Sequence, residues 1–189
     1  MARTQALDYD DKRDRIMKRA AMLFAKSGFG DTSISELAEA CGVSKATIYH
    51  YYRSKEDILY KVMLEHVDEL LDAITNLETE GHSAQDNFRN LTRLLLKLYA
   101  GAQYSQRALL SELDNLSRSQ RKTIVARERR IVEEVEALLT AAKGPSSTSR
   151  AETMLYFGML NWTPNWFRPK GELNRDELAD LASAIVLGR

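Results

Sequence analysis

The feature that most constrains folding is Gly42-Val43-Ser44, a three-residue break between two short segments with helical spacing of apolar residues. Gly42 suits the position after a helix where the backbone turns left-handed, because a residue with a side chain resists that conformation. Ser44 can cap the next helix by accepting a hydrogen bond from a free backbone N–H. We therefore expect one helix to end at Cys41 and another to begin at Lys45.

Two helices joined by such a turn form the helix-turn-helix unit, whose second helix enters the major groove of DNA. The composition agrees, since the stretch from Cys41 to Lys55 contains three cations and no acid. The first of the two helices opens with Ser33-x-x-Glu36, the pattern of a capping box. Its apolar side chains should pack on those of an earlier helix around Phe24 and form a small three-helix core.

The rest of the chain has helical periodicity, with no β pattern, internal repeat or low-complexity tract. Residues 1–10 carry no periodic pattern and are expected to form a loose arm. Pro164, Pro169 and Gly171 should force an irregular link between the last two helices. The expected helices lie at about 12–27, 33–41, from 45 onward, 54–77, 86–101, 105–113, 120–142, 150–165 and 175–187. We predict an all-α fold of about nine helices, with a DNA-binding head at 1–56 and a ligand-binding and dimerisation body at 57–189.

Composition narrows the class of protein. No apolar run approaches the ~20 residues that cross a bilayer, and the N-terminus lacks the apolar segment of a signal peptide. The single cysteine, Cys41, excludes an internal disulfide and fits a reducing compartment. We expect a cytoplasmic protein with no membrane partner.

Charge restricts where DNA could bind. The chain has 27 basic and 27 acidic residues, and residues 1–60 hold ten of the former against nine of the latter. A near-neutral chain does not bind DNA over its whole surface. Affinity should therefore come from local clustering at the second helix and from its duplication in a dimer.

Residues from about Arg13 to Leu59 resemble the DNA-binding segment of TetR-type transcriptional regulators. The resemblance is carried by AAMLFAKSGFGDTSISELAEACGVSKATIYHYYRSKEDIL, which runs from Ala20 to Leu59 without a gap. It implies a homodimer on a roughly palindromic double-stranded DNA operator. By position in the family motif, the DNA contacts would be Ser33, Ser35, Ser44, Lys45, Thr47, Tyr49, His50, Tyr51 and Lys55.

In this family the body encloses a ligand cavity, and its last two helices pair with their copies across a four-helix dimer interface. The implied cavity wall is Phe88, Leu91, Leu95, Tyr99, Tyr104, Leu110 and Trp162. The implied interface is Met154, Leu155, Phe157, Gly158, Met159, Trp162, Leu178, Leu181, Ala182, Ile185 and Val186. The stretch NWTPNWFRPKGELNRDEL is similar to members that answer to acyl-CoA thioesters, which implies a small apolar or acyl-CoA-like effector.

Three features have plainer interpretations beside functional ones. Cys41 could sense redox state, but it lies on the apolar face of a helix, which favours a buried structural thiol. His66 lies in the apolar stripe of a long helix, where a hydrogen-bonded histidine is favoured over a ligand contact. The basic residues at 118–130 alternate with glutamates, which favours a solvated face over a second DNA site.

The expected function is a ligand-responsive transcriptional regulator, with a repressor favoured over an activator. An architectural DNA-binding protein without a ligand is the first alternative. A small helical enzyme is the second, but no nucleophile–base pair, phosphate-binding glycine loop or metal-ligand spacing supports it. We expect no cofactor and no metal site.

Overall fold

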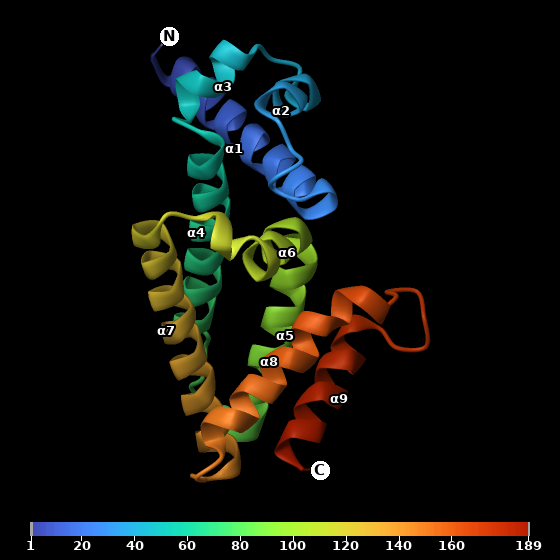
Figure 1. The fold of residues 1–189 in the computed structure, drawn as a ribbon. Coiled ribbons are helices and arrows are strands. Elements are labelled where there is room, and N and C mark those ends of the chain that lie inside the picture. Colours follow the sequence, from blue (N-terminus) through green and yellow to red (C-terminus); the bar gives the residue numbers. More distant parts are fainter. Residues whose placement is uncertain (1, 189) are drawn as a thin grey trace. The chain divides into compact units, whose positions relative to one another are not determined.

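The computed structural model describes residues 2–188, and every regular element among them is a helix (Figure 1). In chain order these are α1 (Ala2–Ser27), α2 (Ile34–Cys41), α3 (Lys45–Tyr51), α4 (Lys55–Thr75), α5 (Ala84–Gly101), α6 (Gln103–Ser111), a 3-10 turn (Leu113–Asn115), α7 (Arg118–Lys143), α8 (Ser149–Trp166) and α9 (Arg175–Leu187). For the described residues, the predicted all-α fold with nine α-helices is confirmed.

These helices form two compact units. The first contains residues up to 67 together with 104–125, and the second contains residues 68–103 together with those from 126 onward. The sequence predicted a boundary after residue 56 between a DNA-binding head and a ligand-binding body. That boundary separates functions rather than packed units, and it stays a prediction.

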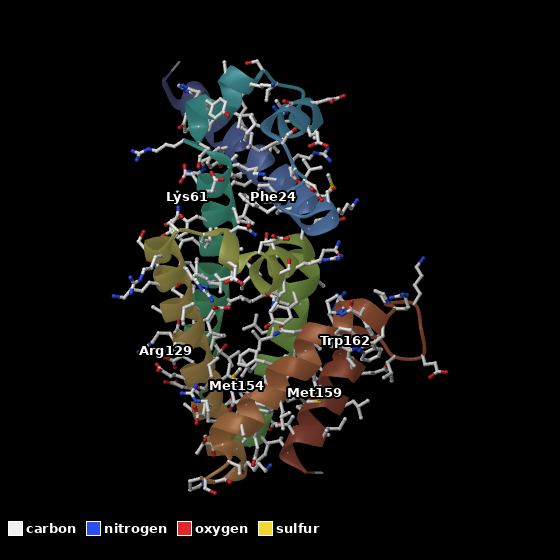
Figure 2. The ribbon with its side chains drawn as sticks, in the orientation of Figure 1. Phe24, Lys61, Arg129, Met154, Met159 and Trp162 are labelled. Atoms are coloured by element: carbon white, nitrogen blue, oxygen red, sulfur yellow. The ribbon has the colours of Figure 1, made fainter. Side chains whose placement is uncertain are left out.

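The first unit is built on the packing of α1 against α2 and of α2 against α3. Phe24 from α1, Leu37 from α2 and Ile48 from α3 are each no more than 1% exposed (Figure 2 labels Phe24). Each such side chain stabilises the unit by about 1.5–3 kcal/mol relative to exposure in water. The three-helix core expected from the sequence is therefore present.

The second unit is built on α5, which packs against α9, and on α8, which also packs against α9. Its centre is Tyr156 of α8, which is fully buried and lies 5.1 Å from the ring of Phe88. The Tyr156 hydroxyl donates a hydrogen bond to Thr92 Oγ1 at 3.0 Å, so its polar atom is not left unpaired in the core. Burial raises the pKa of Tyr156, which stays neutral.

Residues 1–10 differ from expectation, because α1 already begins at Ala2. The sequence contains no glycine or proline before Gly28, so nothing interrupts the helix that Ile16 and Phe24 anchor in the core. The prediction of a loose arm was therefore wrong. The start of the helix has no apolar stripe, but it continues the part of α1 that is anchored in the core.

The end of α8 also differs, because the helix continues through Pro164 to Trp166. Proline cannot donate a hydrogen bond to the carbonyl four residues earlier. Here that carbonyl, of Leu160, accepts a hydrogen bond at 2.7 Å from the hydroxyl of Thr163 instead. The irregular link is therefore confined to residues 167–174.

Candidate functional site

The turn between α2 and α3 has the predicted geometry. Gly42 adopts φ 66° and ψ 35°, the left-handed conformation that favours glycine. The N–H groups of Gly42 and Val43 donate to the carbonyls of Glu39 and Ala38, both at 3.0 Å, and so close the end of α2. Ser44 Oγ accepts from the N–H of Thr47 at 3.0 Å and caps α3. The helix-turn-helix is confirmed at both junctions.

One face of α3 is anchored and another is free. Ile48 is fully buried and holds the helix on the three-helix core. Lys45, Tyr49 and His50 are exposed, and Tyr49 keeps 55% of its surface accessible, which is unusual for so large a ring. A seven-residue helix held on one side with aromatic, imidazole and ammonium groups on the other is suited to contact base edges and phosphates.

The predicted phosphate contacts around the two helix starts are accessible but already engaged in caps. Ser33 Oγ accepts from the N–H of Glu36 at 3.1 Å, and the Glu36 carboxylate accepts from the N–H of Ser33 at 2.8 Å. This reciprocal capping box was predicted, and its hydrogen bonds from Ser33 lower the pKa of Glu36. The hydroxyls of Ser44 and Thr47 lie 2.9 Å apart at the start of α3. Ser35 is exposed in the first turn of α2, beside the Ser33 cap.

Lys55 has a different environment from the one expected. Its ammonium donates to the carbonyls of Phe29 at 2.6 Å, Gly30 at 3.3 Å and Thr32 at 2.8 Å, and it lies 4.2 Å from the centre of the Phe29 ring. An ammonium has three protons, and three backbone acceptors occupy them. Lys55 thus ties the start of α4 to the segment between α1 and α2. A phosphate contact from Lys55 stays a prediction, and it would require one of these bonds to be given up.

We expect Lys55→Met to lower the free energy of unfolding by about 2 kcal/mol, because hydrogen bonds to a charged group are lost and three carbonyls lose their donor. For a chain of this size that corresponds to a fall in Tm of about 4–8 °C by calorimetry. The matched control is Lys45→Met, at an exposed lysine, which should weaken DNA binding with little change in Tm. Equal Tm values for the two variants would contradict the structural role of Lys55.

Tyr9 lies beside the candidate site, although the sequence did not predict it as a site residue. Its ring lies 4.6 Å from that of Tyr51 and 6.2 Å from that of His50, and His50 and Tyr51 contact each other at 5.2 Å. Because α1 extends to Ala2, it places Tyr9 beside the end of α3. The only signal was an aromatic residue in a segment otherwise rich in charges, which is too weak to assign a role.

We predict that Tyr9→Ala weakens operator binding by about tenfold. Aromatic contacts of this kind contribute about 0.5–1.5 kcal/mol beyond burial, and a dimer contains two copies. The measurement is a gel-shift titration, with Tyr9→Phe as the control that keeps the ring and should bind normally. If the alanine variant binds as tightly as the parent, Tyr9 does not position His50 and Tyr51.

Cys41 and His66, for which both a functional and a structural interpretation were considered, lie in environments that support the structural one. Cys41 is a buried free thiol, and burial raises its pKa, which disfavours the reactive thiolate. His66 of α4 is 3% exposed and shares a hydrogen bond of 2.5 Å with Gln106 of α6. The expected buried thiol and hydrogen-bonded histidine are both confirmed.

The basic segment of α7 is paired with acids, as expected for a solvated face. Arg121 binds Asp114 at 2.6 Å, and Arg130 binds Glu134 at 2.9 Å, one helical turn away. Arg127 pairs with Asp68 of α4. These ion pairs favour the solvated face over a second DNA site.

The predicted cavity wall is divided by the structure. Phe88, Leu91 and Leu95 are fully buried core residues of the second unit, where Tyr99 is 4% exposed. Tyr104 and Leu110 belong to the first unit, and Leu110 and Trp162 are 52% and 65% exposed. Leu110 and Trp162 are too exposed to belong to the core of either unit, and their place in a ligand cavity stays a prediction.

One cavity of about 160 Å³ lies within the second unit, between α5, the end of α8 and the start of α9. Tyr99 is the only residue of the predicted wall that lines it. The lining residues are Leu96, Tyr99, Ala100, Gln103, Thr163, Pro164, Phe167, Arg175 and Leu178. Most of these residues could not be predicted from the sequence, because they come from three separate segments, two of which lie around the irregular link.

The predicted dimer interface is largely exposed. Among the described residues, six of the nine large exposed apolar side chains lie on α8 and α9 (Figure 2 labels Met154, Met159 and Trp162). These six are Met154, Leu155, Trp162, Trp166, Leu181 and Ile185. Such a patch on one pair of helices marks an interaction surface. Trp166 was not predicted.

Three members of the predicted interface lie in the core instead. Phe157, Leu178 and Ala182 are 8%, 5% and 7% exposed, because they pack between helices of the same unit. They have little surface to offer a partner. We therefore restrict the predicted interface to Met154, Leu155, Gly158, Met159, Trp162, Leu181, Ile185 and Val186 and add Trp166.

Comparison with protein families identifies the class of protein that this helix-turn-helix and helical body define. Residues 16–62 match the family described as bacterial regulatory proteins, tetR family, and residues 81–189 match the tetracyclin repressor-like C-terminal domain. The second match alone spans more than half of the chain. The chain belongs to the TetR family of transcriptional regulators, and α2 and α3 form its DNA-binding helix-turn-helix. This confirms the resemblance noted in the sequence and excludes the enzyme alternative.

Individual relatives agree with this assignment. A TetR-family transcriptional regulator from Bordetella parapertussis 12822 is 34% identical, with a TM-score of 0.86 over 93% of both chains. The HTH-type transcriptional repressor KstR2 of Rhodococcus jostii (strain RHA1) is 25% identical over 93% of this chain and 89% of its own length. The structure of AibR in complex with isovaleryl coenzyme A and operator DNA is 24% identical, with a TM-score of 0.78 over 92% of this chain and 97% of that one, and shares the fold.

Other matches are confined to one part of the relative. Two HTH-type regulators of Bacillus subtilis (strain 168), YuxN and YerO, are each 33% identical, over 85 and 95 residues. The chain spans only 29% and 31% of their lengths.

Within residues 2–188, no helix combines the length and apolar character that a membrane crossing requires. In the same residues, no cluster of three or more His, Cys, Asp or Glu side chains has the arrangement of a metal site.

Proposed function

We propose that the chain is a homodimeric, effector-responsive repressor, in which residues 1–56 bind a palindromic operator and residues 57–189 bind the effector and the second copy. The observation that carries the proposal is the anchored and exposed recognition helix, with Ile48 buried and Tyr49 55% exposed. Two such helices in a dimer meet successive major grooves about 34–36 Å apart. The relative KstR2 is a transcriptional repressor, which supports repression rather than activation.

The effector is a small apolar molecule or an acyl-CoA thioester. The cavity of the second unit supports this, because its volume of about 160 Å³ is of the order of the ~150 Å³ apolar cavity that holds benzene. The acyl part of a short thioester fits such a volume, whereas the whole coenzyme does not. AibR, a structural neighbour, was crystallised with isovaleryl coenzyme A and operator DNA.

An effector releases the operator only through its different affinities for the two conformers of the protein, a coupling that is typically ~1–3 kcal/mol. Helices α4 and α7 each contain residues of both units, so a change in the second unit can alter the spacing of the two recognition helices.

Thermal-shift screening against short acyl-CoA thioesters and aromatic acids, followed by gel shift with each hit, tests the proposal. A ligand that raises Tm and weakens operator binding about 5- to 150-fold is the expected result. A protein that binds its operator equally well with every stabilising ligand is instead a ligand-independent DNA-binding protein.

A further inference from the structure

The cavity between α5, α8 and α9 has a mixed lining of polar and apolar groups and one charged group in its wall. Leu96 and Leu178 are buried on its sides, and Pro164 and Phe167 contribute apolar surface from the end of α8. The charged group is Arg175, the first residue of α9, which is half-buried. A recess that combines apolar surface with a few convergent polar groups is a common form of a small-molecule site.

Arg175 is available to a ligand. Within residues 2–188 its guanidinium makes no ion pair or hydrogen bond, although acids are close in the sequence. Two nearby acids are occupied: the Asp180 carboxylate binds Arg93 at 2.8 Å, and the Glu177 carboxylate accepts from the N–H of Asn174 at 2.7 Å. The third, Asp176, is exposed and forms no ion pair with Arg175. A half-buried guanidinium without a partner lacks the compensation that buried charges usually have.

The start of α9 does not itself provide an anion site. Asn174 Oδ1 already accepts from the N–H groups of Asp176 and Glu177, at 2.9 and 3.0 Å. Recognition of a negative charge at this position therefore depends on the Arg175 side chain. A guanidinium can bind a carboxylate or a phosphate through two parallel hydrogen bonds.

A second hollow adjoins the first, and Arg175 lines both. The second hollow also contains Lys97 of α5, which is exposed and, within the described residues, forms no ion pair. Its other charged lining residues are Arg93, which pairs with Asp180, and the acids Asp176, Glu177 and Asp180. A molecule whose apolar end fills the first cavity can therefore extend its charged end past Arg175 toward Lys97.

We propose that this cavity binds a short acyl or aromatic group that carries a negative charge, with the apolar body between Leu96, Phe167 and Leu178 and the charge on Arg175. The assignment rests on the proposed effector function and adds the location of the site and the charge of its ligand. Two sources share this chemistry: a free carboxylic acid, whose carboxylate pairs with Arg175, and an acyl-CoA thioester, whose phosphates reach Arg175 and Lys97.

Isothermal titration calorimetry of the protein without DNA tests the site. The probes are isovalerate and benzoate, their coenzyme A thioesters, and the uncharged isoamyl and benzyl alcohols. At least one anionic probe should bind about tenfold more tightly than the alcohol of the same carbon skeleton, because a charged hydrogen-bonded pair is lost in the alcohol. Whether the free acid or its coenzyme A thioester binds shows which of the two is the ligand. If none of the anions binds up to millimolar concentration, the proposal is overturned.

Three variants test the residues. Arg175→Gln should weaken binding of the anion by about tenfold and leave binding of the alcohol unchanged. Arg175→Lys should restore part of the lost affinity for the anion. Arg168→Gln is the matched control, because Arg168 is an exposed cation outside the cavity lining, and it should bind normally. Ala100→Phe should abolish binding of anion and alcohol alike, because it fills the cavity from an exposed position. Equal losses in Arg175→Gln and Arg168→Gln would overturn the role of Arg175.

Gel shift with the same proteins separates this site from the proposed function. If an anion binds through Arg175 but leaves operator binding unchanged, the site stands and the effector function fails. If an effector releases the operator equally from the parent, Arg175→Gln and Ala100→Phe, the effector function stands and this site is overturned.

Discussion

Tyr49→Ala should weaken specific operator binding by at least about thirtyfold while the protein stays dimeric. Tyr49 is on the exposed face of α3 with 55% of its surface accessible, and Ile48 beside it carries the packing of the helix. Loss of one base contact costs about 1–3 kcal/mol, and a dimer loses two, so the expected change is about 2–6 kcal/mol. A gel-shift titration at fixed salt measures it, because phosphate contacts make affinity depend on salt.

Two controls separate this effect from a general one. Tyr49→Phe keeps the ring, so its affinity shows how much of the contact comes from the hydroxyl. Leu110→Ala removes a side chain of similar exposure, 52%, from α6 and should leave operator affinity unchanged. Wild-type affinity in the Tyr49→Ala protein would exclude α3 as the reading helix.

Trp162→Asp should raise the dissociation constant of the dimer by about a thousandfold. The indole is 65% exposed on α8, amid the exposed apolar side chains of α8 and α9 (Figure 2). Tryptophans at the centre of interfaces contribute about 2 kcal/mol or more each, and a twofold axis places two of them in the interface. The charge adds a desolvation cost. Sedimentation or light scattering over a range of concentrations measures the result.

The matched control is Leu110→Asp, which adds the same charge at an exposed apolar position outside α8 and α9 and should remain dimeric. Leu155→Asp, at a residue 73% exposed, tests the same face independently. In the monomeric variants operator affinity should also fall, because a single head contacts one half-site. A normal dimer in both Trp162→Asp and Leu155→Asp would show that the two copies meet elsewhere.

Predictions from the sequence were most accurate where a local pattern specifies a local structure. The Ser33 capping box, the left-handed Gly42 and the Ser44 cap involve residues within five positions of one another, and all three are present. The prediction of which face of α2 is buried was correct for the same reason, because helical periodicity alone identifies the apolar face.

Predictions from the sequence were less accurate where the packing of residues far apart in the chain decides which side chains are buried. The interface list included Phe157 and Leu178, which have the same spacing as exposed neighbours but pack inward. The phosphate contact expected of Lys55 from its position in the motif stays a prediction, but the sequence did not show that its ammonium donates to the carbonyls of residues 29, 30 and 32. Periodicity shows that a helix has an apolar face, but it does not show which neighbour covers that face.

The amino-acid order alone was enough to determine the all-α class and the helix-turn-helix, because caps, turns and periodicity are properties of short segments. The contacts of Tyr9 with α3, the engagement of Lys55, the exposed face of α8 and the cavity beside Arg175 could be known only from the folded chain. Each of these brings together residues from separate helices, and their packing is set by the shapes and volumes of many side chains at once.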